Sequence, residues 1–211
     1  MQLTEIMSAI SGDPEQMIRG IVRIFHFIGL AMGLGAATLL DMMILRFFLG
    51  RDITSQNVEL FIFFADLVAV GLKMLWITGF GFLLYYWAYE PVKLGNEKVW
   101  AKMTIVAILS INGVFLHKAV IPFLAQQIGQ TMLHGLPLHK RMLFITAGMI
   151  SFVSWYAPLV IANLPHLNFQ VPMIQILGVY AITLIGVLSV AYIGLLGHFV
   201  AGVARPREQL W

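Results

Sequence analysis

The stretch RIFHFIGLAMGLGAATLLDMMILR, residues 23–46, decides the fold of this chain. Between its two arginines lie 22 residues, enough for a helix rising about 1.5 Å per residue to cross a hydrocarbon core of about 30 Å. One histidine and one aspartate interrupt this apolar run, and we expect both to face protein or a cofactor, because lipid is a costly surrounding for them. Steps of three and four residues place five positions on one helix face: His26, Gly29, Gly33, Ala37 and Asp41. The small residues between the two polar ones predict a groove that admits either a neighbouring helix or a flat ligand.

The composition of the chain is that of a polytopic membrane protein. Of 211 residues, 60% are hydrophobic and 11% charged, and the mean hydropathy is +0.87, whereas soluble domains carry roughly 25% charged residues. The formal net charge of +3 is too small to indicate a nucleic-acid partner. The chain has no cysteine, which excludes disulfides, thiolate metal sites and iron–sulfur ligation.

Hydrophobic periodicity and turn residues predict an all-α fold, a single membrane domain of five transmembrane helices over residues 1–211. The predicted helices cover about 14–49, 57–89, 98–126, 139–162 and 173–204, with a short interfacial helix over 2–11. The first begins at Asp13-Pro14-Glu15-Gln16, where Asp is the expected N-cap and Pro the first helical residue. No internal repeat is found, which disfavours an inverted-repeat transporter.

Five spans place the two ends of the chain on opposite sides of the membrane. We name the side where the first helix begins A and the other side B. Five basic residues fall toward side A, namely Arg19, Arg23, Lys93, Lys98 and Lys102. Seven fall toward side B, namely Arg46, Arg51, Lys118, Lys140, Arg141, Arg205 and Arg207. The positive-inside rule favours side B as cytoplasmic, so we expect a bacterial inner-membrane protein with its N-terminus outside.

Four ionisable residues lie at a similar predicted depth, although they come from four different helices. Counted from the B-side helix ends, Asp41, Asp66, His117 and His198 all lie about 12–14 Å into the membrane, taking about 1.5 Å per residue. Two carboxylates and two imidazoles at one level predict a site for a Zn, Fe, Mn or Cu ion. The alternative is that the two histidines are axial ligands of haem b. His26 is a further candidate ligand for either group.

Lys73 is a further ionisable residue within an apolar helix. It lies seven residues after Asp66, two turns along the same face. A lysine near mid-membrane is costly, which favours either a functional role or pairing with another group. The chain has no phosphate-binding loop, His-Glu-x-x-His motif or nucleophile elbow. Any chemistry is therefore expected to be a redox reaction, or the transfer of protons or ions, within the membrane.

Three segments carry a resemblance to known membrane proteins. They are Arg23-Ile-Phe-His26-Phe-Ile-Gly-Leu, then Thr78-Gly79-Phe-Gly81 with the later Glu90-Pro, and Val99-Trp100-Ala-Lys102-Met-Thr-Ile-Val-Ala-Ile-Leu. Over about residues 20–125 the chain resembles the HemJ-type protoporphyrinogen oxidases, and the segment from Lys102 to Pro122 is similar to CopD-like membrane domains. The first resemblance implies that His26 is a haem b ligand and that Lys102 is a supporting basic residue.

Three functions follow as expectations. The leading one is a haem b-binding redox protein, with His26 as a ligand toward side A, His117 and His198 as an axial pair toward side B, and Lys102 or Lys73 neutralising propionates. The alternative is a metal-binding protein or transporter that uses the Asp/His site. The third is an accessory subunit of a larger membrane complex without chemistry of its own. Expected partners are membrane lipid, a quinone, porphyrin or redox partner, and a homo-oligomer or larger complex.

Overall fold

The computed structural model describes residues 14–48, 52–130 and 136–203, without the side chains of residues 48 and 195–203. The long helices are α2 (Pro14–Phe48), α3 (Ser55–Tyr89), α4 (Glu97–Phe115), α6 (Leu138–Ala162) and α7 (Met173–Val203). The shorter ones are η1 (Pro91–Gly95), η2 (Leu116–Val120), α5 (Ile121–Gln126) and η3 (Pro165–Leu167). The all-α class with five long apolar helices is therefore confirmed. The predicted interfacial helix at 2–11 lies outside the described residues.

Helix ends differ from the predicted ends by at most two residues, and side-chain caps explain two of the differences. The Thr54 hydroxyl accepts a hydrogen bond from the backbone N–H of Asn57 at 3.2 Å, so α3 begins at Ser55. The Asn96 side chain accepts from the backbone N–H of Lys98 at 3.2 Å, and α4 begins at Glu97. Such caps satisfy backbone donors that the first turn of a helix leaves unpaired.

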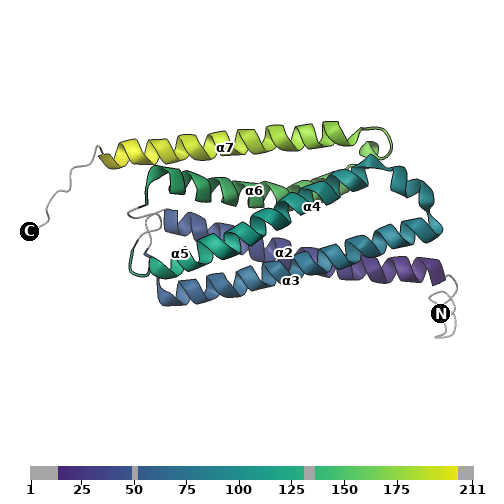
Figure 1. The fold of residues 1–211 in the computed structure, drawn as a ribbon, viewed down its shortest axis with the longest axis horizontal. Helices are drawn as coiled ribbons and strands as arrows, with labels where there is room; N and C mark the ends of the chain where they lie inside the picture. The colour runs from purple at the N-terminus through teal and green to yellow at the C-terminus, as the bar shows by residue number, and fades with distance from the viewer. Residues whose placement is uncertain (1–13, 49–51, 131–135, 204–211) are drawn as a thin grey trace, which may run out of the picture.

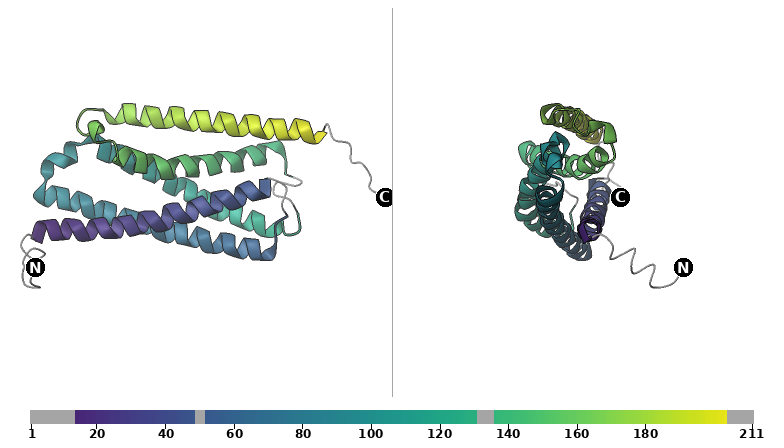
Figure 2. Two further views of the ribbon diagram at one scale, coloured as in Figure 1. Left: turned by 180° about the vertical axis from the view of Figure 1, so that it is seen from behind. Right: turned by 90° about the vertical axis from the view of Figure 1, so that its right-hand side faces the viewer.

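The five long helices lie along one common direction in layers (Figures 1 and 2). α2 packs against α3, α4 packs against α6, and α7 covers the outer side of α4 and α6. The beginning of α2 and the end of α7 lie at opposite ends of the bundle (Figure 1). We call these the A end and the B end, as in the sequence. All five long segments are long and apolar enough to cross a membrane, and the chain is an integral membrane protein.

The glycine groove of α2 is filled by a neighbouring helix and by an indole ring. A Cβ atom added at Gly71 of α3 would lie 2.5 Å from the backbone nitrogen of Gly33 and 2.7 Å from the carbonyl oxygen of Gly29. One added at Gly33 would lie 2.3 Å from the ring of Trp155 on α6. The groove that the sequence predicts therefore admits α3 and Trp155, and the absence of side chains brings the two backbones together.

The third predicted helix is one continuous helical segment with an irregular turn. α4 passes into the π-helical turn η2 and then into α5. Pro122 has no N–H, so the carbonyl of Lys118 four residues earlier lacks its usual helical partner. A π-turn just before a proline adjusts the hydrogen-bonding register, and such turns are frequent at functional sites. Both His117 and Lys118 lie in this turn.

Polar side chains join the middle layer to its neighbours. The Asn112 amide donates to the Ala147 carbonyl at 2.8 Å, which joins α4 to α6. The hydroxyls of Ser154 and Tyr180 are hydrogen-bonded at 2.8 Å, which joins α6 to α7. Because lipid offers these groups no partner, hydrogen bonds between helices satisfy them.

Candidate functional site

In the part of the chain that the structure describes, a cavity lies toward each end of the bundle, and a layer of side chains shared by the two linings lies between them. The A cavity has a volume of about 430 Å³ and the B cavity about 440 Å³. Trp76, Leu109 and Trp155 line both. Leu109 and Trp155 belong to a buried cluster with Ala37 and Leu75. Any molecules bound in the two cavities would be separated by this central layer alone.

The A cavity is lined by cationic side chains. Arg19 and Arg23 come from α2 and Lys102 from α4, His26 of α2 lies beside them in the lining, and no Asp or Glu is among the described lining residues. Lys102 is half-buried, and no hydrogen bond or ion pair of its ammonium group is found within residues 14–48, 52–130 and 136–203. A half-buried cation facing a cavity favours an anionic group there, because Coulomb attraction is strong where water is scarce.

A hydrogen bond determines the tautomer of His26. Its Nδ1 lies 2.7 Å from the Thr78 hydroxyl, and that hydroxyl lies 2.6 Å from the Met74 carbonyl. The carbonyl only accepts, so the single hydroxyl proton goes to Met74 and His26 must donate its Nδ1–H to Thr78. Nε2 then carries a lone pair and no proton in the neutral ring. A metal-bound histidine has this arrangement, with its other nitrogen held by a hydrogen-bond acceptor.

Neighbouring contacts hold the His26 ring and one of the arginines. The ring of His26 lies edge-on to Phe82, with the ring centres 5.5 Å apart. Arg19 reaches Glu90 at 3.4 Å, and Lys93 reaches the other oxygen of the same carboxylate at 2.5 Å. Glu90 therefore holds Arg19 at the A end of the cavity. Lys98, in contrast, is 5% exposed and donates to the carbonyls of Ala162 and Leu164. These hydrogen bonds join the beginning of α4 to the end of α6.

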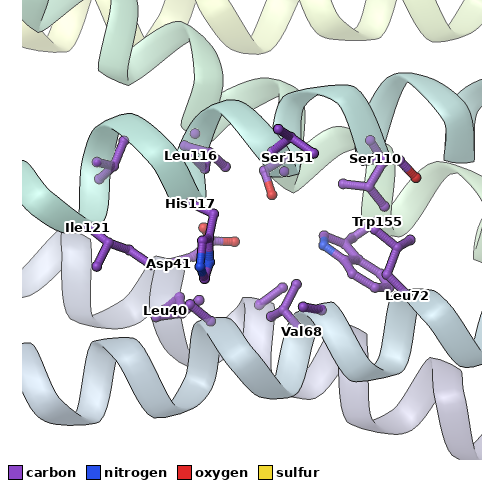
Figure 3. Close-up of a pocket in the computed structure, with 18 of the residues that line it drawn as sticks. Leu40, Asp41, Val68, Leu72, Ser110, Leu116, His117, Ile121, Ser151 and Trp155 are labelled. Atoms are coloured by element: carbon purple, nitrogen blue, oxygen red, sulfur yellow. The ribbon is translucent and has the colours of Figure 1, made fainter.

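The B cavity has apolar walls and a few inward-facing polar groups. Its polar lining residues are Asp41 of α2, Lys73 of α3, Ser110 of α4, His117 and Lys118 of η2, and Ser151 of α6. In Figure 3 the Asp41 and His117 side chains lie on one side of the empty space and Trp155 on the other. Asp41 is half-buried, whereas Lys73 and His117 are exposed. Both exposed residues therefore lie at the margin of the cavity.

Trp155 contributes a buried donor without a partner. Its side chain is 3% exposed, and its Nε1–H has no hydrogen-bond acceptor within the described residues. Figure 3 shows this nitrogen directed into the B cavity. Trp76, by comparison, donates its Nε1–H to Ser110 at 2.9 Å. Leaving a buried donor unpaired costs about 1–3 kcal/mol, so the Trp155 N–H favours an acceptor in the cavity.

The structure divides the predicted site residues between the two cavities. His26 and Lys102 line the A cavity together, and Asp41, Lys73 and His117 line the B cavity. Asp66 is exposed and lines neither cavity, and no ion pair joins it to Lys73 in the described part of the chain. The side chain of His198 lies outside the described residues. Among those that are described, no three His, Cys, Asp or Glu side chains form a group able to hold a metal ion.

Several residues that line the cavities, or that hold a lining side chain as Thr78 holds His26, were not predicted from the sequence as site residues. In the sequence, Thr78 belongs to a segment that carries the family resemblance, and Arg19 is one of the basic residues that indicate orientation. Ser151 and Trp155 lie one turn apart in a continuous apolar helix, and nothing in their local sequence distinguishes them from core residues. The spacing of four residues was the available signal, since it places both on one face.

Comparison with known proteins identifies no relative of this chain. No protein-family model, no curated protein and no solved structure matches the chain.

Proposed function

We propose that this protein binds haem b in the A cavity through His26 and has a redox role in the membrane, as an electron-transfer protein or oxidoreductase. The observation that carries the proposal is that His26 lines a cavity with cationic side chains, and its hydrogen bond to Thr78 leaves Nε2 unprotonated in the neutral ring. A histidine with Nδ1 bonded to an acceptor is the usual form of a metal-ligating imidazole. When bound, haem supplies one-electron chemistry whose potential depends on its axial ligands and burial.

The charges of the A cavity fit the chemistry of haem b. The two propionates of haem are anions, and Lys102, Arg19 and Arg23 would bind them. The remaining lining is largely apolar and includes Leu30, Phe82 and Met103, as an apolar macrocycle requires. A volume of about 430 Å³ lies within the usual range of about 300–1,000 Å³ for ligand cavities.

The residues of the chain have separate roles in this proposal. His26 would ligate through Nε2, and Thr78 would hold the ring by accepting from Nδ1. Lys102 would neutralise carboxylate charge. Glu90 would keep Arg19 at the mouth of the cavity through their ion pair. His117 and Lys73 line the B cavity, so a role in binding the A-cavity haem is not proposed for them.

The decisive experiment is visible absorption of the purified protein, oxidised and dithionite-reduced, with a pyridine haemochrome assay for stoichiometry. We expect a Soret band and one haem per chain, with loss of haem in His26→Ala. His166→Ala is the matched control, because His166 is exposed and lines neither cavity. A colourless protein after expression with added haem, or full haem content in His26→Ala, would contradict the proposal.

We further propose that the protein lies in a bacterial inner membrane with the B end cytoplasmic. The sequence count of seven basic residues toward side B against five toward side A supports this orientation.

A further inference from the structure

We propose that the B cavity is a quinone-binding site, in which the Trp155 N–H donates a hydrogen bond to one ring oxygen. The inference concerns binding alone and does not depend on haem in the A cavity. It rests on the lining of the B cavity, on an unpartnered buried donor and on the position of the cavity mouth.

The walls of the B cavity fit an apolar ring. The described lining residues of α2, α3, α4 and α6 are mostly aliphatic or aromatic, as Leu40, Val68 and Leu72 illustrate. The volume of about 440 Å³ suits a small molecule. A few precisely placed polar groups within apolar walls are the usual composition of a small-molecule site.

The unpartnered donor distinguishes a quinone from a lipid chain. The Trp155 Nε1–H is buried, has no acceptor within the described residues and is directed into the cavity. A hydrocarbon chain would leave this N–H unpaired, whereas a quinone carbonyl oxygen accepts it. Ser151 lies one turn before Trp155, and its hydroxyl also points into the space (Figure 3).

The second oxygen of a quinone has candidate partners across the cavity. His117 and the half-buried Asp41 lie on the side opposite Trp155 in Figure 3. The imidazole presents an N–H in either neutral tautomer, and a protonated carboxyl group also donates. A ring with oxygens at opposite ends is therefore matched by polar groups at opposite ends of an apolar cavity.

The mouth of the cavity opens toward the surface that faces lipid. The exposed lining residues include Lys73 of α3, Val114 of α4, which is 55% exposed, and His117 and Lys118 of η2. All four lie in segments apolar enough to span the membrane, so we infer that this exposed part of the lining faces the bilayer. A ligand that enters there must dissolve in lipid, as quinones do.

The test measures binding of decylubiquinone to the full chain in nanodiscs by titration calorimetry, with empty nanodiscs as the blank. We expect saturable binding of one molecule per chain. Trp155→Phe keeps an aromatic ring but removes the N–H, and it should weaken binding by about three- to tenfold. Trp100→Phe is the matched control, because Trp100 lines neither cavity and its N–H already donates to the Leu94 carbonyl.

A second ligand keeps the proposal testable if Trp155→Phe does not fold. Decylbenzene has the same tail but no ring oxygens, and wild-type protein should bind it at least tenfold more weakly. Equal binding of the two ligands would assign the cavity to an acyl chain and overturn the proposal. Absence of saturable decylubiquinone binding, or unchanged affinity in a folded Trp155→Phe variant, would also overturn it.

Discussion

The hydrogen bond between His26 and Thr78 decides which nitrogen of the imidazole is free. Thr78 gives its only proton to the Met74 carbonyl, so it accepts from His26, and in the neutral ring Nε2 is then without a proton. Sequence position alone could not supply this information, because Thr78 is 52 residues away on another helix. The histidine was identifiable from the sequence, but its tautomer required its neighbour.

Replacing Thr78 tests the role of this hydrogen bond. Thr78→Val removes the acceptor while keeping the branched shape, and we expect haem affinity to fall by about 10–100-fold, the usual effect of losing a partner of a ligating histidine. Thr78→Ser keeps the hydroxyl and should restore binding. Haem titration followed at the Soret band measures both variants. Equal affinity in the Val and Ser variants would show that Thr78 does not orient the ligand.

At the scale of the helix, the close approach of α2 and α3 depends on glycine. Gly71 lies against the backbone of Gly29 and Gly33, where any Cβ atom would approach backbone atoms to within 3 Å. Backbone atoms cannot rotate away as a side-chain tip can, so an added methyl group must separate the two helices. The separation would also displace Trp155, whose ring rests on Gly33.

Gly71→Ala is therefore expected to destabilise the protein by about 1–3 kcal/mol, the typical cost of overpacking. Gly35→Ala is the matched control: Gly35 lies on α2, and its added Cβ would meet nothing within 4 Å. Because alanine favours helix over glycine by about 0.8–1.0 kcal/mol in soluble hosts, that control should be neutral or stabilising. Thermal unfolding in detergent compares the two, and equal unfolding temperatures would contradict the assignment of a tight α2–α3 contact.

At the scale of the whole molecule, the two cavities differ in charge. The A cavity is lined by Arg19, Arg23 and Lys102 without a described carboxylate, whereas the B cavity has Asp41 together with Lys73 and Lys118. An anionic ligand is therefore expected at the A end, whereas the Asp41 carboxyl group disfavours an anion in the B cavity. The central layer that separates them includes two tryptophans, Trp76 and Trp155.

Lys102→Gln tests the charge of the A cavity. Hydrogen bonds to charged groups contribute about 1.5–3 kcal/mol, so haem affinity should fall about tenfold or more, and Lys102→Arg should retain most of it. Lys140→Gln, an exposed position outside both cavities, should leave affinity unchanged. Haem titration of the three variants gives the comparison, and a Lys102→Gln affinity equal to wild type would exclude an electrostatic role.

The absence of cysteine allows a direct test of orientation. Val92 in η1 is 76% exposed at the A end, and His139 is exposed near the B end. In intact cells, Val92→Cys should react with a membrane-impermeant maleimide, whereas His139→Cys should react only after lysis. The reverse pattern would place the A end in the cytoplasm.

The sequence by itself determined the number of helices, their extents to within two residues and the membrane setting, because each follows from local hydrophobicity and helical periodicity. It also identified His26, Asp41 and His117 as polar residues within apolar spans. His26 and Lys102 were associated only through a family resemblance, and the structure places both at one cavity. The predicted common depth of Asp41, Asp66, His117 and His198 was a weaker guide to a site, because Asp66 is exposed and lines neither cavity.

Only the tertiary structure decided which faces meet. Residue spacing places Gly29 and Gly33 on one face of α2 but cannot say that Gly71 and Trp155 fill the groove. Residue spacing also cannot predict that His26 is hydrogen-bonded to Thr78, or that the Trp155 N–H lacks an acceptor among the described residues. The physical reason is that periodicity fixes directions about a single helix axis, whereas a site requires the relative position and rotation of several helices. Those are set by packing between distant segments.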